Sequence, residues 1–293
     1  MAERQTEQVH PLGKGLHRQP AQAVLSAVLV TQEQALAKLH ACLPDLERAA
    51  DLAAEALLAG GKLAYAGAGS SGLMALADCL ELAGTFGIPR EQTPMLFAGG
   101  AAALLAMTGG VEDDVAQAMT DVVNAGIGAG DVVLCLAASG STPYTVAVAT
   151  AARSAGARVI GLANIANAPL YDLSDISVLL ETGPEVVAGS TRLGAATAQK
   201  AALNMISVLV GVRLGAVHDG QMVNLIADNI KLVDRAARIV ARIAGTGEEA
   251  ARVALHHTNG AVKPAILVAR GQSADAALQA LAASGGKLAP YLD

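Results

Sequence analysis

Two glycine-rich loops in the sequence carry hydroxyl side chains in a pattern that suits a phosphate group. The first reads GAGSSG at residues 67–72, after an apolar run and directly before a helical pattern. Glycine lets backbone N–H groups approach a ligand closely, and a helix N-terminus presents unpaired donors with a partial positive charge. Gly69, Ser70 and Ser71 are therefore candidate phosphate ligands, although Ser70 serving only as a helix cap explains the pattern equally well.

This loop also matches the letters of the dinucleotide-binding fingerprint G-x-G-x-x-G. The fingerprint needs an acidic residue at the end of a second strand about twenty residues further on, which is missing here. Glu91 lies at about that distance, but in an expected loop. We therefore expect a phosphate ester rather than a dinucleotide.

The second loop reads ASGSTP at residues 138–143 and again follows an apolar run. Thr142 is a natural N-cap and Pro143 a natural first helical residue. The hydroxyls of Ser139, Ser141 and Thr142 together exceed what capping requires. Two such loops on one sheet predict a single phosphorylated ligand held between them.

A third segment, GSTR at residues 189–192, opens another helical pattern. Ser190 or Thr191 can cap this helix, and Arg192 could supply a fixed positive charge to a substrate. A capped helix with an exposed arginine is the alternative, and spacing alone does not separate the two.

Two glutamates are candidates for acid–base chemistry. Glu81 lies on a helix that is mostly apolar from Leu73 onward, so its carboxyl either reaches a cavity, has a partner, or marks a solvent edge. Glu112 begins the triplet EDD at residues 112–114, which by itself indicates acidic residues complementing a helix dipole. Two carboxyls in different environments can divide the roles of acid and base.

The elements that must position these residues alternate between strand and helix. Short apolar runs predict strands at residues 62–69, 94–100, 131–139, 157–164 and 175–182, with helical patterns at 101–107, 114–125, 142–155 and 189–214 between or after them. Such alternation predicts a parallel sheet covered on both faces, with its ligand loops at one edge.

Outside this α/β region the sequence predicts helices only. An extended arm covers residues 1–20, and helices fill residues 21–58 with breaks near Thr31 and Pro44. After Leu214 we expect no further strands but a long amphipathic helix over residues 219–244, followed by three shorter helices. These form a small helical appendix.

Composition excludes several classes of function. The 293 residues are 53% hydrophobic and 2% aromatic, with a net charge of −6 and no basic run, which argues against nucleic-acid and anionic-membrane partners. Three scattered cysteines and His256-His257 match no disulfide framework or metal-ligand spacing. No apolar stretch reaches the ~20 residues of a membrane span without interruption, and the N-terminus lacks the apolar core of a signal peptide. We expect a soluble cytoplasmic protein without a metal.

Taken together, these segments resemble the N-acetylmuramic acid 6-phosphate etherases, which belong to the sugar isomerase (SIS) superfamily. The resemblance extends from a Thr6-Glu7 pair through the C-terminal helices. Its motifs are YAGAGSSG (65–72), Asp78, Glu81, TFG (85–87), AGG (98–100), EDD (112–114), AASGSTPY (137–144), TGPEVVAGSTR (182–192), ATAQKAALNMIS (196–207), VRLG (212–215), MVN (222–224) and KLVDR (231–235).

The resemblance implies a reaction and a set of site residues. The family cleaves the lactyl ether of N-acetylmuramic acid 6-phosphate by elimination and hydration, without a cofactor, and gives N-acetylglucosamine 6-phosphate and D-lactate. Its acid–base glutamates map onto Glu81, as general acid, and Glu112, as the base at C2. The phosphate ligands map onto the two hydroxyl-rich loops, with Ser190 and Arg192 nearby. It also implies a homodimer with the site near the interface.

The resemblance further implies the architecture. It predicts a three-layer α/β/α SIS domain with a five-stranded parallel sheet at residues 44–215. N-terminal helices would occupy residues 1–43, and a C-terminal helical region residues 216–293.

Leu73, Gly109, Gly194 and Ile230 depart from the family pattern by replacing charged or polar residues. Two alternatives therefore stay open. One is a phosphosugar-sensing protein without catalysis, and the other is an SIS enzyme, such as an aldose–ketose isomerase, acting on another phosphosugar.

Overall fold

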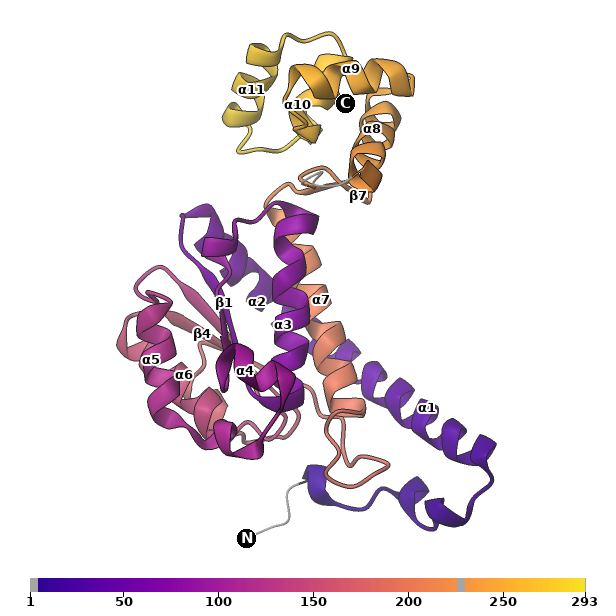
Figure 1. Ribbon diagram of the computed structural model, residues 1–293, viewed down its shortest axis with the longest axis vertical. Coiled ribbons are helices and arrows are strands. Elements are labelled where there is room, and N and C mark those ends of the chain that lie inside the picture. The colour runs from indigo at the N-terminus through magenta and orange to yellow at the C-terminus, as the bar shows by residue number, and fades with distance from the viewer. Residues whose placement is uncertain (1–4, 226–229, 293) are drawn as a thin grey trace. The chain divides into compact units, whose positions relative to one another are not determined.

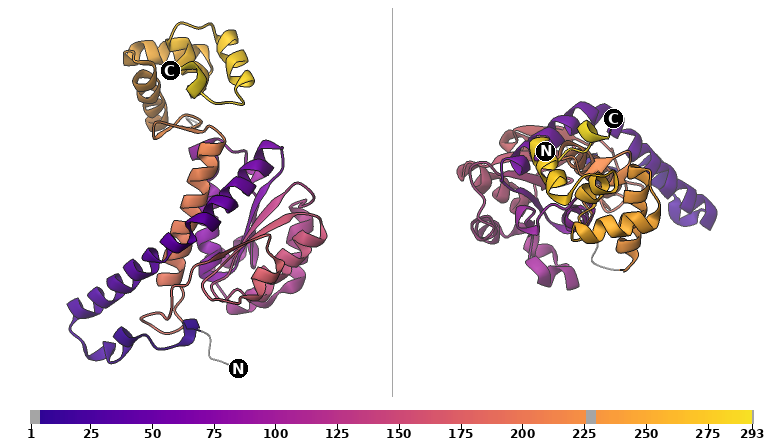
Figure 2. Two further views of the ribbon diagram at one scale, coloured as in Figure 1. Left: turned by 180° about the vertical axis from the view of Figure 1, so that it is seen from behind. Right: turned by 90° about the horizontal axis from the view of Figure 1, so that it is seen from above.

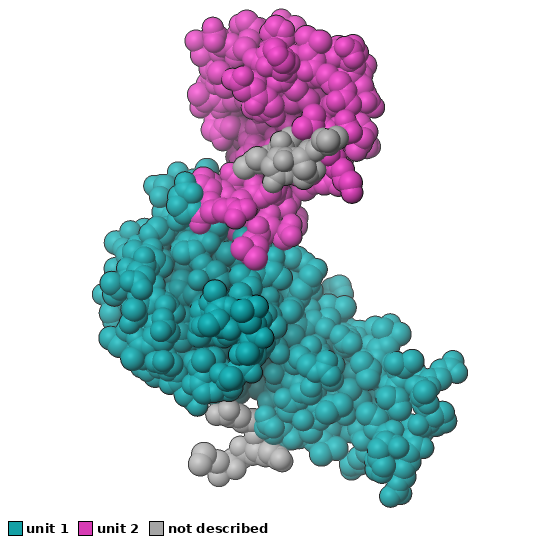
Figure 3. Space-filling model, viewed as in Figure 1, with its two compact units in different colours: residues 1–79, 91–207 teal, residues 80–90, 208–293 magenta. Residues whose placement is uncertain are grey.

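The computed structural model describes residues 5–225 and 230–292, which form two compact units (Figure 3). The first unit comprises residues 1–79 and 91–207, and the second comprises residues 80–90 and 208–293. The boundaries cross two helices, α3 (Gly69–Phe86) and α7 (Gly194–Arg213). The division of the chain at residues 43 and 215 stays a prediction.

The first unit contains a five-stranded parallel sheet (Figure 1), which confirms all five predicted strands. The strand order is β2-β1-β3-β4-β5. The strands are β1 (Leu63–Gly67), β2 (Met95–Phe97), β3 (Val132–Leu136), β4 (Arg158–Ala163) and β5 (Ile176–Leu179). Every residue of β1 and β3 is buried, as expected for central strands with both faces covered.

Helices cover both faces of the sheet (Figures 1 and 2). Ala64 and Ala66 of β1 belong to an apolar cluster with α5 (Val115–Asn124) and α6 (Pro143–Ser154). The intervening Tyr65 instead donates a hydrogen bond to Asp78 of α3 at 2.9 Å. The period of two in a strand thus separates the layers and confirms a three-layer α/β/α fold.

Asp78 joins β1, α3 and α7 through a buried polar network. Besides the Tyr65 hydroxyl, its carboxylate accepts hydrogen bonds from the Asn204 amide at 2.7 Å and the Ser207 hydroxyl at 3.0 Å. Asp78 is only 6% exposed, so these three donors replace the water that a carboxylate otherwise binds. The network joins the middle of α3 to the sheet and to α7.

The N-terminal segment differs from its prediction in two ways. The helices α1 (Ala21–Ala37) and α2 (Leu39–Leu58) break at Lys38, and Thr31 and Pro44 lie inside them. The Thr31 hydroxyl donates to the carbonyls of Ala27 and Val28 within its own helix, so it does not end the helix. The arm is not extended throughout, because it contains the short 3₁₀ turns η1 (Gln5–Glu7), η2 (Pro11–Gly13) and η3 (Leu16–Arg18).

The second unit corrects the prediction that strands end at Leu214. A two-stranded antiparallel hairpin forms from β6 (Val217–His218) and β7 (Gln221–Met222), where we expected the start of a helix. Asp219 and Gly220 both adopt positive φ angles, the backbone of a tight hairpin turn, and Asp-Gly is a favoured pair for it. Part of the expected helix, residues 226–229, lies outside the described residues, and with it Asn229, which also belongs to the family resemblance.

The rest of the second unit is helical, as predicted. Its helices are α8 (Ile230–Ala244), α9 (Glu248–His257), α10 (Val262–Ala269) and α11 (Ala274–Ala283), followed by η7 (Ala289–Tyr291). They share an apolar core that includes Val240, Leu255, Ile266 and Leu281.

Short helical elements connect the longer ones in the rest of the chain. After β2 come α4 (Gly100–Leu105) and η5 (Gly109–Asp113). The 3₁₀ turns η4 (Arg90–Gln92) and η6 (Pro169–Leu173) precede β2 and β5, respectively.

Among the described helices, α7 alone is long and apolar enough by length and composition to cross a membrane. More than half of its most apolar window, 56%, is buried within the protein. Its Asn204 and Ser207 take part in the Asp78 network. These contacts are those of a core helix.

Replacing Asp78 with asparagine tests the buried network. The Asp78→Asn variant removes the charge and replaces one acceptor oxygen with an amide NH₂ group, which faces the donors that Asp78 binds. We therefore expect a loss of about 2–4 kcal/mol in the free energy of unfolding. Asp45→Asn is the matched control, because its partner Arg48 is exposed and such pairs contribute about 0–1 kcal/mol. Urea denaturation measures both variants, and equal losses would contradict the role given to the network.

Candidate active site

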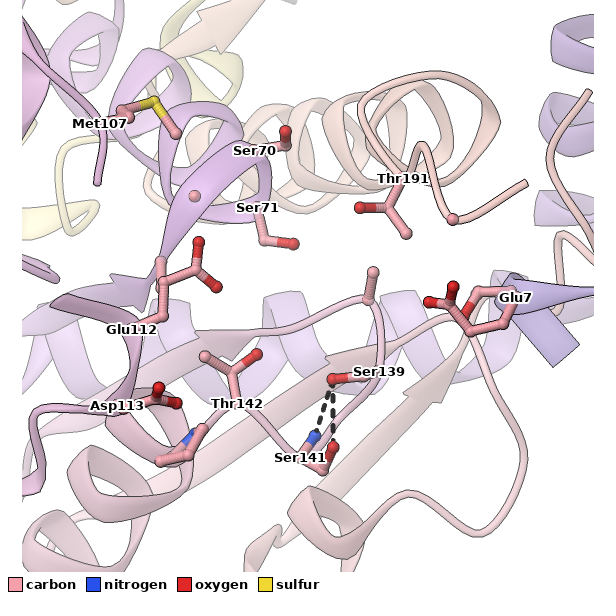
Figure 4. A pocket seen from close by; sticks show the side chains of 16 residues that line it. Glu7, Ser70, Ser71, Met107, Glu112, Asp113, Ser139, Ser141, Thr142 and Thr191 are labelled. Atoms are coloured by element: carbon pink, nitrogen blue, oxygen red, sulfur yellow. Dashed lines mark hydrogen bonds between the residues drawn. The ribbon is translucent and has the colours of Figure 1, made fainter. Parts of the chain in front are cut away.

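The two predicted loops line one cavity of about 570 Å³ at the carboxyl edge of the sheet (Figure 4). Six of the eight predicted substrate ligands contribute to its wall, namely Gly69, Ser70, Ser71, Ser139, Ser141 and Thr142. Glu112 lines the same cavity. The structure thus brings together residues that are up to 73 positions apart in the chain.

The first loop is a tight turn from β1 into α3. A Cβ atom on Gly72 would lie 2.7 Å from Cε2 of Phe97, and one on Gly67 would lie 3.0 Å from Cα of Gly72. Only glycine at both positions lets the chain turn this closely. The turn delivers Ser70 and Ser71 into the first turn of α3, beside backbone N–H groups that lack helical partners.

The second loop leaves a hydroxyl of its helix cap available. Thr142 occupies the N-cap of α6, but its side chain makes no capping hydrogen bond. The Ser139 hydroxyl accepts hydrogen bonds from the backbone N–H of Ser141 at 3.3 Å and from its hydroxyl at 3.2 Å. The interpretation that these hydroxyls exceed capping needs therefore agrees with the geometry.

The third segment contributes differently from the prediction. Glu185, buried to 3% exposure, caps α7 by accepting hydrogen bonds from the N–H groups of Gly194 at 2.9 Å and Ala195 at 2.8 Å. The expected cap by Ser190 or Thr191 is wrong, because a carboxylate from the preceding turn takes that place.

Gly189 and Thr191 line the cavity from this segment, whereas Ser190 and the exposed Arg192 do not. A substrate-binding role for Ser190 and Arg192 stays a prediction. Three of the departures from the family pattern, Leu73, Gly109 and Gly194, also lie outside the cavity wall.

Glu112 is half-buried in η5 and lies against the start of α3. A Cβ atom on Gly69 would lie 2.6 Å from its Oε1 atom, so the absence of a side chain at Gly69 makes room for the carboxylate. Burial raises the pKa of Glu112, and the neighbouring charge of Asp113 raises it further. Asp113 also lines the cavity, whereas Asp114 caps α5 by accepting from the N–H of Gln117 at 2.8 Å.

Glu81 does not line this cavity. It is exposed and lies three helical turns beyond Ser70 on α3, in the part of the helix that belongs to the second unit. A catalytic role for Glu81 stays a prediction.

Sequence reasoning assigned no role to several residues in the cavity wall. The N-terminal arm contributes Thr6 and Glu7, and the segment between α4 and η5 contributes Met107. The arm has no periodicity that would have indicated a site, and the resemblance of the Thr6-Glu7 pair was its only signal.

Comparison with known proteins identifies the family. The sequence model of the SIS domain matches residues 20–164. An N-acetylmuramic acid 6-phosphate etherase of Deinococcus radiodurans is 43% identical over 97% of this chain and 93% of its own length. The chain belongs to the N-acetylmuramic acid 6-phosphate etherase family.

Two further comparisons bear on the family and on the fold. An etherase of Yersinia pestis is 38% identical over 97% of this chain and 96% of its own length. A solved phosphoheptose isomerase from Francisella tularensis matches 67% of this chain and 98% of its own, with a TM-score of 0.50 and 20% sequence identity. At 20% identity the similarity to the isomerase concerns the fold alone, and it agrees with the SIS architecture.

The Asp113→Asn substitution tests the electrostatics of the site. Because the Asp113 charge disfavours ionisation of Glu112, its removal lowers the pKa of Glu112. NMR titration of the glutamate side-chain carboxyls measures this shift. Asp114→Asn serves as a control that weakens the α5 cap and leaves the pKa of Glu112 unchanged, and an unchanged pKa in Asp113→Asn would contradict the stated cause.

The same pKa has a consequence for stability. A raised pKa means that the folded state holds its proton more tightly than the unfolded state. Ionisation of Glu112 therefore lowers stability as the pH rises from the ordinary glutamate pKa of about 4.3 through the raised value. Glu112→Gln removes this part of the pH dependence.

Proposed function

We propose that this protein cleaves the D-lactyl ether of N-acetylmuramic acid 6-phosphate, giving N-acetylglucosamine 6-phosphate and D-lactate. The activity for which its full-length relatives are named supports this reaction. The structural observation that supports this reaction in the present chain is that Glu112 lines the same cavity as both hydroxyl-rich loops. A phosphate anchor and a carboxyl base are two of the parts that the reaction needs.

The two loops bind the 6-phosphate in this proposal. Ser70, Ser71, Ser139, Ser141 and Thr142 supply hydroxyl donors, and the first turns of α3 and α6 supply backbone N–H groups. Among the described residues, the cavity wall contains no lysine or arginine. The phosphate charge is therefore met by helix N-termini and hydroxyl dipoles.

Glu112 acts as the base at C2 of the open-chain sugar. It takes the C2 proton, the C–H electron pair forms the C2–C3 double bond, and the C3–O bond to the lactyl group breaks. A general acid protonates the departing oxygen, which yields D-lactate. Water then adds at C3, and a proton returns to C2. The raised pKa of Glu112 makes its carboxylate a stronger base for the first step.

Glu81 is the general acid, supplied by a second copy of the chain. In a single chain it lies outside the cavity wall, next to Leu80, whose side chain is 60% exposed. In the proposed homodimer the partner chain covers this part of α3. The surroundings of Glu81 then become less exposed to water, and its carboxyl reaches into the partner's cavity.

The α1 helix provides further support for a homodimer. Only Thr31 and Ala35 are buried among its 17 residues, while Leu25 and Leu29, one turn apart, are 70% and 59% exposed. An apolar stripe of this kind is typical of a helix that packs against another chain.

A cytoplasmic location agrees with the proposed substrate, because phosphorylated sugars are charged and do not leave a cell freely. Cys42, Cys79 and Cys135 are all buried free thiols, which is typical of reducing compartments.

Release of D-lactate from N-acetylmuramic acid 6-phosphate tests the proposed reaction. We expect turnover by the wild-type protein and a fall of about 10²-fold or more in kcat for Glu112→Gln and for Glu81→Gln, with product binding retained. Glu91→Gln changes an exposed glutamate outside the cavity and should turn over normally. A wild-type protein that binds phosphosugars but releases no D-lactate would refute the etherase activity and favour a sensing role.

The dimer is tested by a Leu25→Glu/Leu29→Glu double variant. Placing two charges on the apolar stripe of α1 should convert a dimer into a monomer in sedimentation-velocity experiments and abolish D-lactate release, because the partner's general acid is lost. Val253→Glu, at a residue 50% exposed on α9, is the control and should remain dimeric. A wild-type monomer with full activity would contradict the proposed assembly.

A further inference from the structure

The N-terminal arm brings a second glutamate into the cavity, far from Glu112 in the chain. Glu7 ends η1, and its side chain lines the same cavity as the two loops. In Figure 4 the carboxylates of Glu7 and Glu112 lie at opposite ends of the view, with the hydroxyls of both loops between them. The mechanism proposed above gives Glu7 no role.

The backbone of the arm is fixed to the segment that precedes α7. Thr6 is only 2% exposed, and its carbonyl accepts a hydrogen bond from the N–H of Gly189 at 3.0 Å. Further along the arm, a Cβ atom on Gly13 would lie 2.5 Å from the carbonyl oxygen of Val186. Two close backbone contacts therefore hold the arm on either side of Glu7, and the position of Glu7 does not depend on its own side chain.

The Glu7 carboxylate rests against Gly189. A Cβ atom on Gly189 would lie 2.8 Å from Oε2 of Glu7, and Gly189 has a φ of +74°, which also favours glycine. Within the described part of the chain, the Glu7 carboxylate makes no hydrogen bond and no ion pair. Its oxygens are therefore available to a ligand in the cavity.

The chemistry of a carboxylate restricts what this ligand group can be. An ionised carboxylate only accepts hydrogen bonds, and it repels a phosphate or another carboxylate. The hydroxyls of the two loops are the donors that an anion needs, so the phosphate belongs there. The group that meets Glu7 must instead be a donor, and a sugar offers two neutral kinds, a hydroxyl and an amide N–H.

We propose that Glu7 is a specificity-determining residue that accepts a hydrogen bond from a hydroxyl or N-acetyl N–H of the bound sugar while the two loops hold its phosphate. The N-terminal arm thus recognises the sugar, whereas the loops at the sheet edge bind the phosphate. This inference rests on the proposed function only in taking the ligand to be a phosphorylated amino sugar.

Calorimetric titration with two ligands tests the proposal. N-acetylglucosamine 6-phosphate offers both the phosphate and the sugar donors, and inorganic phosphate offers the phosphate alone. For Glu7→Ala we expect about 10- to 100-fold weaker binding of the sugar phosphate, with less than about a twofold change for inorganic phosphate. Glu7→Gln keeps one acceptor oxygen and should lose less. Gln8→Ala, at the exposed next residue outside the cavity wall, is the control and should bind both ligands normally.

The results that would overturn the proposal are equally specific. Equal losses for both ligands would mean that Glu7 only supports the cavity, and unchanged sugar-phosphate binding would mean that it contacts no donor. Wild-type protein that fails to bind N-acetylglucosamine 6-phosphate would refute both this proposal and the phosphosugar site. Wild-type protein that binds N-acetylglucosamine 6-phosphate but releases no D-lactate from N-acetylmuramic acid 6-phosphate would refute the etherase activity alone. The ratios of mutant to wild-type Kd for the sugar phosphate and for inorganic phosphate would still decide the role of Glu7.

Discussion

The parallel pairing of β1 with β3 is the constraint on which the rest of the site depends. These strands are neighbours in the order β2-β1-β3-β4-β5, and Gly67 at the end of β1 pairs with Leu136 at the end of β3. Strand order reverses its direction between them, so the helices that follow leave toward opposite faces of the sheet. The two loops therefore begin at the same level and open a crevice between them, which is where ligands bind in this class of fold.

The cavity that results combines groups that attract an anion with groups that repel one. Hydroxyls and helix N-termini gather at the sheet edge, whereas the carboxylates of Glu7, Glu112 and Asp113 come from the arm and from the segment after β2. Helix N-termini and hydroxyls attract an anion, whereas a nearby carboxylate repels it. In the proposed reaction the phosphate binds to the loops and the sugar carbons extend toward Glu112, so that C2 comes within reach of the base. Burial raises the pKa of Glu112, and the charge of the neighbouring Asp113 raises it further.

The sequence predicted the parts of the structure whose signals are local. Short apolar runs, four of them followed closely by glycine, predicted all five strands, and the hydroxyl-rich turns after β1 and β3 predicted six of the cavity residues. The hairpin at Asp219-Gly220 was missed because a helical pattern downstream outweighed the turn signal of this dipeptide. The cap of α7 was missed because Glu185 reaches it from nine residues upstream, while nearer hydroxyl residues stood at the expected positions.

Long-range contacts were beyond local patterns altogether. The hydrogen bond from Gly189 to the Thr6 carbonyl joins the two ends of the first unit, and no periodicity marks either partner. Glu81 is the reverse case, because the family resemblance singles it out although it does not line the cavity of a single chain. In the proposed mechanism its place depends on a second copy of the chain, and no local pattern in the sequence marks such a contact.

A crystal structure with N-acetylglucosamine 6-phosphate bound tests the central claim most directly. The account predicts the phosphate between the two loops, within hydrogen-bond distance of Ser70 or Ser71 and of Ser139, Ser141 or Thr142. It also predicts that the sugar carbons extend toward Glu112. A phosphate bound elsewhere, or a sugar directed away from Glu112, would contradict it.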